Sequence, residues 1–383
     1  MSDNQLFLLR TITKRFKLLI AGLLILSVTG CSSDSRSPAP QDTAATITAD
    51  KPLAMQSADH TLQNNNLEIH FLDVGQGLSV FAQSNGRTML YDGGDREYSS
   101  YVVSYLKDQG VESLDYIIAS HYDADHLNGL VGAMNAFSIG TIIGPDYVHT
   151  SRVYDSFISR AGELGKKVEH PQPGTEYTLG DARITILSPQ TIVSNSNNNS
   201  IAIKIQNGED VILIMGDAEH AEEADILASG IDLDCAVLVL GHHGSASSTT
   251  WDLLQNTVPE YAVISCGRDN PYGHPHAETM EKLESMDIDM FRTDLQGTIT
   301  AVSDGRSLVW NEPPSADYTA GNEATSQPTA EFNHVSQMVW KSATGSKYHS
   351  IPDCGSMNPD KATEITLDYA EAIGLGRCKN CWR

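Results

Sequence analysis

Ser120–Leu130 reads SHYDADHLNGL, a stretch that places four side chains able to bind a metal within six positions: His121, Asp123, Asp125 and His126. It follows LDYIIA at 114–119, an apolar run typical of a buried strand. Loops at strand ends are where rigid scaffolds place reactive groups. The stretch therefore favours a metal site. The alternative is a solvated polar loop in which Asp125 caps a helix.

Two other apolar runs end in the same kind of residue. VILIMG at 211–216 is followed by Asp217, and VLVLG at 237–241 is followed by His242 and His243. Three strand ends that each carry metal ligands favour one shared centre. Two alternatives stay open: Asp217 could cap the helix that follows it, and His243 could be an ordinary turn residue.

Strand and helix patterns alternate around these motifs. Residues 67–94 read as three short strands with a hairpin turn at Asn85-Gly86. Helices are expected over four ranges: 98–109, 127–137, 218–229 and 276–286. Strands that alternate with helices predict an α/β fold whose sheets are covered by helices.

Further motifs accompany SHYDADHLNGL in a fixed order: DVGQG at 73–77, GD at 216–217, HHGS at 242–245 and YGHP at 272–275. Together they resemble the hydrolase domain of the ComEC-type competence proteins, which are DNA-uptake proteins with a metallo-β-lactamase fold. SHYDADH resembles the HxHxDH motif of that fold, with an aspartate in place of the second histidine. The resemblance implies a four-layer αββα sandwich, with the hydrolase domain at 67–310 and a metal site along one edge of the sheets.

The resemblance also implies a ligand set for two divalent metals. His121 and Asp123 would hold the first metal, and Asp125 and His126 would hold the second. Asp217 matches the aspartate that bridges both metals in this fold.

One of His242 and His243 would complete the second site, and the other would face the substrate. The fold usually offers the first metal a further histidine before the GD strand. This chain has SNNNSIAI at 196–203 instead, so Asn199 or a water would stand there.

The residue types suit phosphoester chemistry. Replacing an imidazole by Asp123 shifts the preference of the first site from Zn²⁺ toward Mn²⁺. Two metals can share a hydroxide and hold the attacking and leaving oxygens of a displacement. We expect a bridging hydroxide to attack a phosphodiester, with His243, Ser245 or His274 stabilising or protonating the departing oxygens. For His274, packing beside Pro275 is an equally good alternative, and Asp73 and Gln76 read as turn residues that brace the site.

Charge limits the substrates. The formal net charge of −24 repels nucleic acid and anionic membranes at long range, which argues against a protein that coats DNA nonspecifically but not against a nuclease. A polyanionic substrate would have to be held by metals or by a small cationic patch. We expect a phosphodiester, with extracellular DNA first. The alternatives are a cell-wall or lipid phosphoester, such as a phosphocholine ester, and a non-enzymatic DNA-uptake or surface-binding accessory protein; the altered first site disfavours β-lactams.

The N-terminus has the pattern of an export signal. Basic residues at 10–17 precede LLIAGLLILSVTG at 18–30, which is short for a membrane-spanning helix. VTGC at 28–31 resembles a bacterial lipobox, which implies cleavage before Cys31 and a lipid on its sulfur. We therefore expect a signal peptide at 1–30, a flexible linker at 31–66, and a protein anchored on the extracytoplasmic face of a bacterial membrane. An uncleaved anchor is the alternative.

A second ligand pattern follows a predicted linker at 311–333. Residues 334–383 contain two ligand pairs at zinc-like spacing: His349 and Cys354, then Cys378 and Cys381. The pattern resembles the small zinc module of Ada-type DNA-repair proteins, with His349 in place of a first cysteine, and implies one structural zinc. Because disulfides persist in exported proteins, a disulfide is the alternative staple. A helix is expected over 365–376.

Overall fold

The computed structural model describes residues 66–321, 338–342, 347–351, 354, 359, 362–366, 375–379 and 381. The chain divides into two compact units, Met1–Thr325 and Ser326–Arg383. The predicted signal peptide, Cys31 and the predicted linker up to residue 65 lie outside the described residues. Within the described part, no helix combines the length and the apolar character that a membrane span requires.

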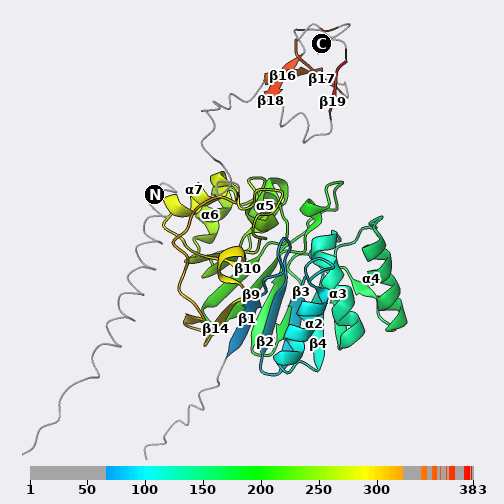
Figure 1. Cartoon of the computed structure of the whole chain (residues 1–383), viewed down its shortest axis with the longest axis vertical. Helices are drawn as coiled ribbons and strands as arrows, with labels where there is room; N and C mark the ends of the chain where they lie inside the picture. Colours follow the sequence, from blue (N-terminus) through cyan, green and yellow to red (C-terminus); the bar gives the residue numbers. More distant parts are fainter. Residues whose placement is uncertain are drawn as a thin grey trace, which may run out of the picture. The chain divides into compact units, whose positions relative to one another are not determined.

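An eight-stranded sheet is one of the two central layers of the first unit (Figure 1). From edge to edge its strands are β15 (Leu308–Trp310), β14 (Ile299–Ser303), β1 (Leu67–Phe71), β2 (Val80–Ser84), β3 (Arg87–Tyr91), β4 (Ser113–Ile118), β5 (Ser138–Ile143) and β6 (Val168–Glu169). The strands β3 to β6 are parallel. The predicted hairpin joins β2 and β3, and both turn residues, Asn85 and Gly86, have the positive φ that a two-residue hairpin loop of this kind needs.

The second sheet has seven strands. In order they are β13 (Asp289–Arg292), β12 (Tyr261–Ile264), β11 (Val237–Val239), β10 (Asp210–Ile214), β9 (Ile203–Asn207), β8 (Ala182–Ile186) and β7 (Glu176–Leu179). The strands β10 to β13 are parallel, whereas β7 to β10 pair antiparallel. The carboxyl ends of β10 and β11 therefore lie at the same edge of this sheet.

Helices cover the outer faces of both sheets. They are α2 (Ser99–Asp108), α3 (Ala124–Ala136) and α4 (Arg152–Glu163) on the first sheet, and α5 (His220–Ala228), α6 (Trp251–Thr257) and α7 (Ala277–Ser285) on the second. Short turns α8 (Thr293–Gln296), η1 (Asn197–Asn199) and η2 (Gly241–Gly244) complete the unit.

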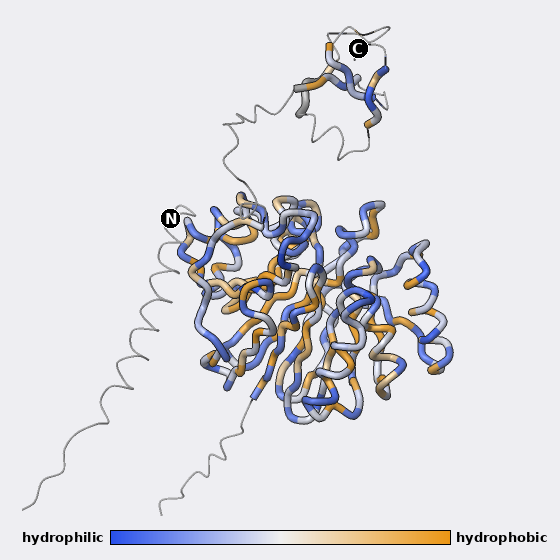
Figure 2. The backbone as a smooth tube through the Cα atoms, viewed as in Figure 1, coloured by the Kyte–Doolittle hydropathy of each residue, from blue (hydrophilic) through white to orange (hydrophobic). Residues whose placement is uncertain are grey.

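Three buried clusters hold these layers together. One cluster lies between the sheets and contains Phe71 and Phe291. A second packs Phe81 of the first sheet against Leu106 of α2. A third packs Leu238 of the second sheet against the helices that cover that sheet. Hydrophobic residues, orange in Figure 2, concentrate along the strands. Since burial of apolar surface is the main favourable contribution to folding, this arrangement stabilises four layers. The predicted αββα sandwich is confirmed.

Two helices begin two or more residues from the expected start. The helix predicted at 127–137 begins at Ala124, with Asp123 at its N-cap. Asp125 and His126 therefore lie in the first helical turn, and the alternative of Asp125 as a helix cap is wrong. The helix predicted at 218–229 has Glu219 at its N-cap, so Asp217 is not the cap either. Both helices have acidic residues in their first turn, Asp125 in α3 and Glu222 and Glu223 in α5, and negative charge is favourable at a helix N-terminus.

The segment 311–321 packs against the second sheet. Ser315 donates its backbone N–H to the carbonyl of Met290 at 2.7 Å, and Gly321 donates to the carbonyl of Pro275 at 2.9 Å. The buried Arg292 guanidinium donates to two carbonyls of the same segment. The folded unit thus extends past the predicted boundary at 310, and residues 322–333 of the predicted linker lie outside the described residues.

The described part of the second unit contains a four-stranded sheet in the order β18 (Thr363–Thr366), β16 (Met338–Lys341), β17 (Lys347–His349) and β19 (Gly376–Arg377). The helix predicted at 365–376 is wrong at Ile365 and Thr366, which belong to β18, and at Gly376, which belongs to β19. Residues 367–374 lie outside the described residues.

Candidate metal centre

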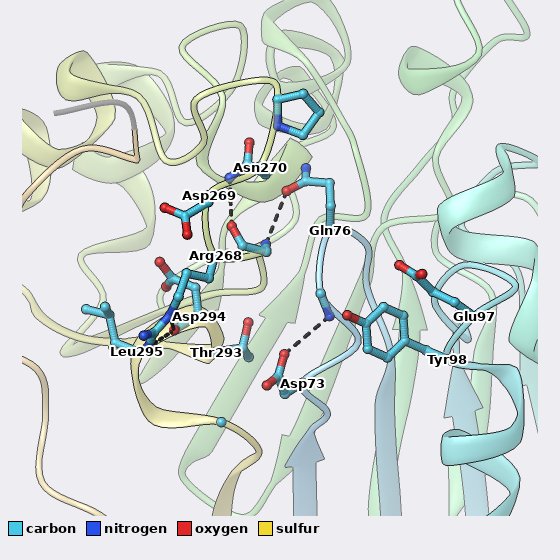
Figure 3. A pocket seen from close by; sticks show the side chains of 14 residues that line it. Asp73, Gln76, Glu97, Tyr98, Arg268, Asp269, Asn270, Thr293, Asp294 and Leu295 are labelled. Carbon is cyan, nitrogen blue, oxygen red and sulfur yellow. Dashed lines mark hydrogen bonds between the residues drawn. The ribbon is translucent and has the colours of Figure 1, made fainter. Parts of the chain in front are cut away.

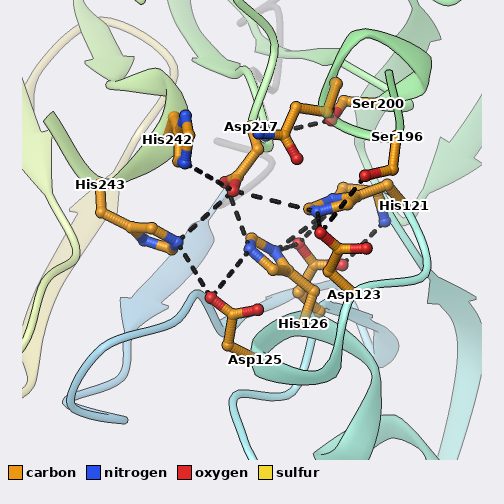
Figure 4. A network of polar contacts seen from close by, with 12 residues as sticks. His121, Asp123, Asp125, His126, Ser196, Ser200, Asp217, His242 and His243 are labelled. Carbon is orange, nitrogen blue, oxygen red and sulfur yellow. Dashed lines mark hydrogen bonds and ion pairs between the residues drawn. The ribbon is translucent and has the colours of Figure 1, made fainter. Parts of the chain in front are cut away.

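Strand ends from both sheets meet at one place. His121 follows β4 of the first sheet, Asp217 follows β10 of the second, and His243 lies in η2 after β11. Gly216, with φ +57°, allows this approach, because a Cβ there would lie 2.7 Å from the Cβ of Ser120. Figure 4 shows the predicted ligands pointing toward one another. Packing of the two sheets therefore creates the centre.

One group of ligand atoms consists of His121, His126 and Asp217, all buried. Nε2 of His126 lies 3.2 Å from Oδ1 of Asp217, and Nε2 of His121 lies 3.9 Å from Oδ2. Asp123 is at the margin of this group, with its Oδ2 3.6 Å from Nε2 of His121. The predicted pairing of His121 with Asp123 is thus adjacent in space, but Asp123 is not in the compact group.

A second group consists of Asp125, His126 and His243. Nε2 of His243 lies 3.5 Å from Oδ2 of Asp125 and 3.6 Å from Oδ2 of Asp217. His126 belongs to both groups, and Asp217 contacts histidines of both. The structure therefore brings together the predicted ligands of two adjacent sites.

These residues fit divalent metals. Among the described residues, four buried atoms of the cluster have no hydrogen-bond partner: Nε2 of His121, His126 and His243, and Oδ1 of Asp217. Buried polar atoms in native structures are nearly always satisfied, so atoms that converge without a partner need an explanation. Imidazole nitrogen and carboxylate oxygen are ligands for several divalent metals. Bound cations would satisfy all four atoms.

Buried partners orient the histidines. Asp92 accepts a hydrogen bond from Nδ1 of His126 at 2.8 Å, and the carbonyl of Ser265 accepts one from Nδ1 of His243 at 2.9 Å. Each contact turns Nε2 of its ring toward the centre, an arrangement typical of metal-binding histidines. Sequence reasoning missed Asp92, although its place directly after a predicted strand was a usable signal.

Electrostatics couple these groups. Burial would raise the pKa of Asp217, but the attraction of His126 and His243 outweighs it and holds the pKa well below its ordinary value. Burial would lower the pKa of His126, but Asp217 and Asp92 raise it well above its ordinary value. The cluster therefore holds carboxylates and imidazoles that stabilise each other's charge.

Comparison with known proteins agrees with this architecture. The profile of the Metallo-beta-lactamase superfamily matches residues 72–268. The chain belongs to the metallo-beta-lactamase superfamily. In this superfamily member, the histidines and aspartates of the cluster are the candidate ligands of a divalent-metal centre.

The curated relatives include competence protein ComA of Neisseria gonorrhoeae, which is 29% identical over 238 residues. ComE operon protein 3 of Bacillus subtilis is 28% identical over 251 residues, which cover 61% of this chain and 32% of that protein. Recombination protein 2 of Haemophilus influenzae is 30% identical over 238 residues, which cover 61% of this chain and 28% of that protein. The chain thus spans about a third of the length of these relatives. The predicted similarity to ComEC-type proteins is confirmed for the metallo-beta-lactamase domain.

A solved structure, the metallo-beta-lactamase fold protein YhfI from Bacillus subtilis, aligns with a TM-score of 0.42 at 14% identity, covering 64% of this chain and all of that one.

His242 and His243 have different surroundings in this metallo-beta-lactamase fold. The side chain of His243 is 3% exposed and its Nε2 lies 3.6 Å from Oδ2 of Asp217, whereas the side chain of His242 is 24% exposed and its Nε2 lies 3.9 Å from the same oxygen. Nδ1 of His242 lies 3.1 Å from the hydroxyl of Ser247 and 3.4 Å from Glu219. The hydroxyl of Ser245 also contacts Ser247, at 3.1 Å. Ser245 thus belongs to a polar network beside His242.

His274 lies next to this network, with its ring centroid 5.4 Å from that of His242. Burial, with His243 and other histidines nearby, lowers the pKa of His274 to about 3. Gln76 donates to Nδ1 of His274 and accepts from the backbone N–H of Gly267, so the neutral ring carries its proton on Nε2. His274 is therefore a neutral hydrogen-bond donor near pH 7, and Gln76 is the brace that the sequence suggested.

Asp123 has partners that sequence reasoning missed. Ser196 donates to its Oδ2 at 3.3 Å, and Nε2 of His149 lies 3.5 Å from its Oδ1. Asn199, expected at the position of the missing histidine, uses both amide atoms on the backbone of Val193. The Asn199 side chain therefore braces its own loop and is not a ligand. No local sequence signal marks His149, which is 26 positions from Asp123.

A pocket of about 520 Å³ lies beyond Gln76 (Figure 3). Its lining contains one arginine, Arg268, and four acidic residues: Asp73, Glu97, Asp269 and Asp294. We call it the acidic pocket. Arg268 donates to the backbone carbonyl of Asp294, so its charge is held against the pocket wall.

The second unit contains a separate group of metal ligands: His349, Cys354, Cys378 and Cys381. The sulfurs of Cys354 and Cys378 are 3.7 Å apart, and Nδ1 of His349 lies 3.7 Å from the sulfur of Cys381. A disulfide needs sulfurs about 2.05 Å apart. Two sulfurs bound to tetrahedral zinc at about 2.3 Å lie roughly 3.8 Å apart. The geometry fits the zinc that the spacing predicts better than it fits the disulfide.

Proposed function

We propose that the chain is an exported, membrane-anchored, metal-dependent phosphodiesterase that acts on DNA. The observation that carries this proposal is the pair of ligand groups that share His126 and touch Asp217. Two divalent ions held there would supply an activated water and positive charge for the oxygens of a phosphodiester. Since the protein carries a net charge of −24, these ions would also provide the attraction that its surface lacks.

The chain's own groups would then bind and orient the ester. Nε2–H of His274, neutral near pH 7, would donate a hydrogen bond to a departing oxygen. His242, open to solvent on one side, would contact the substrate while Glu219 and Ser247 hold its ring. His243 faces the ligand cluster, which makes it better suited to hold a metal than to protonate a leaving group.

Two alternatives have separate supports. The names of the relatives include competence proteins, which is consistent with an accessory role in DNA uptake. The carboxylate of Asp123 favours a harder metal, and such a metal could act on other phosphoesters as well as on DNA. A phosphocholine ester is therefore a second substrate class. Both are decided by the same assay.

The test is hydrolysis by the mature protein, with Mn²⁺ or Zn²⁺ added in turn. We expect cleavage of bis(p-nitrophenyl) phosphate and of DNA, and loss of both in Asp125→Ala. Asp252→Ala is the matched control, because Asp252 also lies in the first turn of a helix but is exposed. Cleavage of p-nitrophenylphosphocholine without DNA would favour the second substrate class. DNA binding without any cleavage would contradict the proposed enzymatic activity and favour an accessory role.

Attachment through Cys31 is a proposal that rests on the sequence alone. Mass spectrometry of the mature N-terminus should find a lipid-modified Cys31 as the first residue. An intact Met1 would contradict it.

A further inference from the structure

A second pocket, of about 540 Å³, lies between α4, β6 and the loop at 144–150. Its wall contains Tyr147 and Tyr154, and basic groups from Lys166, Lys167 and His170. We call it the basic pocket. It belongs to none of the motifs that the sequence singled out.

One lining residue of the basic pocket, Tyr147, contacts the ligand stretch. The hydroxyl of Tyr147 accepts a hydrogen bond from the backbone N–H of Tyr122 at 3.1 Å, and Tyr122 lies between His121 and Asp123. The buried ring of Tyr122 packs against Tyr147 and Tyr154, with centroids 4.8 Å away in both cases. The side chain of Tyr147 therefore connects the pocket to the stretch that carries His121 and Asp123.

The basic pocket and the acidic pocket differ in the charge of their linings. In the basic pocket, Lys166 and Lys167 are exposed, and within residues 66–321 neither has an ion-pair partner. The opposing carboxylate in the lining is Asp146, which lies 3.8 Å from Nε2 of His170. The acidic pocket has four carboxyl groups and one arginine. Of these two pockets, the basic pocket is the one that would attract an anionic substrate.

The basic pocket also offers apolar and aromatic surface. Val148 is 81% exposed and Ile158 is 39% exposed at its rim, beside the rings of Tyr147 and Tyr154. Exposed apolar side chains that gather around one pocket, unlike ones scattered singly, mark a binding surface. Aromatic side chains beside cations are how proteins hold single-stranded nucleic acid, since bases stack and phosphates pair with lysine.

We propose that the basic pocket binds one nucleotide of a single-stranded polynucleotide, adjacent to the phosphodiester at the metal centre. The base packs against Tyr147, Tyr154 and Val148, and a phosphate contacts Lys166 and Lys167. This inference rests on the proposed function, because it names the substrate's flanking unit. A phosphocholine ester also carries a phosphate, and its quaternary ammonium can pack on tyrosine rings, but it has no base, so competition by thymidine monophosphate and by phosphocholine distinguishes the two ligands.

Binding of a fluorescent oligothymidylate to the full mature chain tests the proposal. The Asp125→Ala background prevents cleavage in all samples. We expect the double variant Lys166→Gln/Lys167→Gln to bind about tenfold more weakly, and the slope of log affinity against log salt to fall by about 0.7, the value for one single-strand phosphate contact. Val148→Asp, at an exposed position, should also weaken binding.

The control is Lys107→Gln/Arg306→Gln, which removes the same charge from exposed positions outside the lining and should change binding by less than about twofold. Equal loss in the control and in the lysine variant would overturn the proposal. So would competition by phosphocholine but not by thymidine monophosphate. Hydrolysis of bis(p-nitrophenyl) phosphate by the wild-type chain tests the proposed function separately, because that ester is too small to need the pocket.

Discussion

The carboxylate of Asp92 lies 2.8 Å from Nδ1 of His126, and both side chains are fully buried. The same carboxylate accepts hydrogen bonds from the backbone N–H of Ser120 at 2.8 Å and from its hydroxyl at 2.7 Å. Asp92 thus joins the end of β3 to the end of β4 and to the first turn of α3. It holds Nε2 of His126 toward both ligand groups.

We expect Asp92→Asn to weaken metal binding about 10- to 100-fold, because the amide cannot accept from both His126 and Ser120 with the same geometry. Competition with a chromophoric chelator measures the affinity. Asp108→Asn, at the exposed end of α2, is the control. Unchanged affinity in a folded Asp92→Asn variant would show that the contact does not orient the ligand.

The two adjacent histidines should differ in metal content. His243→Ala is expected to lose about one of two ions per hydrolase unit, because its Nε2 is buried against Asp125 and Asp217. His242→Ala should keep both ions and lose turnover. Metal analysis beside hydrolysis of a model diester measures the two effects. The reverse pattern would assign the ligand role to His242.

Gly216→Ala should destabilise the fold by about 2–5 kcal/mol, since the residue has φ +57° and its new methyl group would collide with Ser120. Gly230→Ala is the matched control, because Gly230 has φ +75° but no atom lies within 4 Å of the place that its Cβ would take. Its cost should be about 1 kcal/mol. Urea unfolding measures both free energies, and equal losses would mean that backbone strain alone, without the steric contact, accounts for the effect.

The cluster in the second unit should bind one zinc. Cys378→Ser and Cys381→Ser are each expected to lower the zinc content by about one ion per chain while diester hydrolysis stays unchanged. Zinc release and thiol titration measure this. A peptide in which Cys354 is disulfide-bonded to Cys378 or Cys381 would contradict the site.

Much of the fold could be predicted from local patterns. The hairpin at Asn85-Gly86 and the helix α2 were predictable because turn chemistry and apolar periodicity act over a few residues. The start of α3 was not, because Asp123 stands at the N-cap position without a side-chain capping hydrogen bond and lies beside the ligands. The helix predicted at 365–376 was wrong at Ile365 and Thr366, which end β18, since a short apolar run has no decisive period.

The sequence by itself determined which residues could form the centre, because His121, Asp125, His126, Asp217 and the histidine pair all follow recognisable strands or lie within one motif. Only the tertiary structure decided how they are used. It turned His243 inward and left His242 beside solvent, and it engaged Asn199 in its own loop. It also placed Asp92 against a histidine 34 positions away. The physical reason is that ligand orientation depends on sheet packing and on partners distant in the chain, which local sequence patterns do not encode.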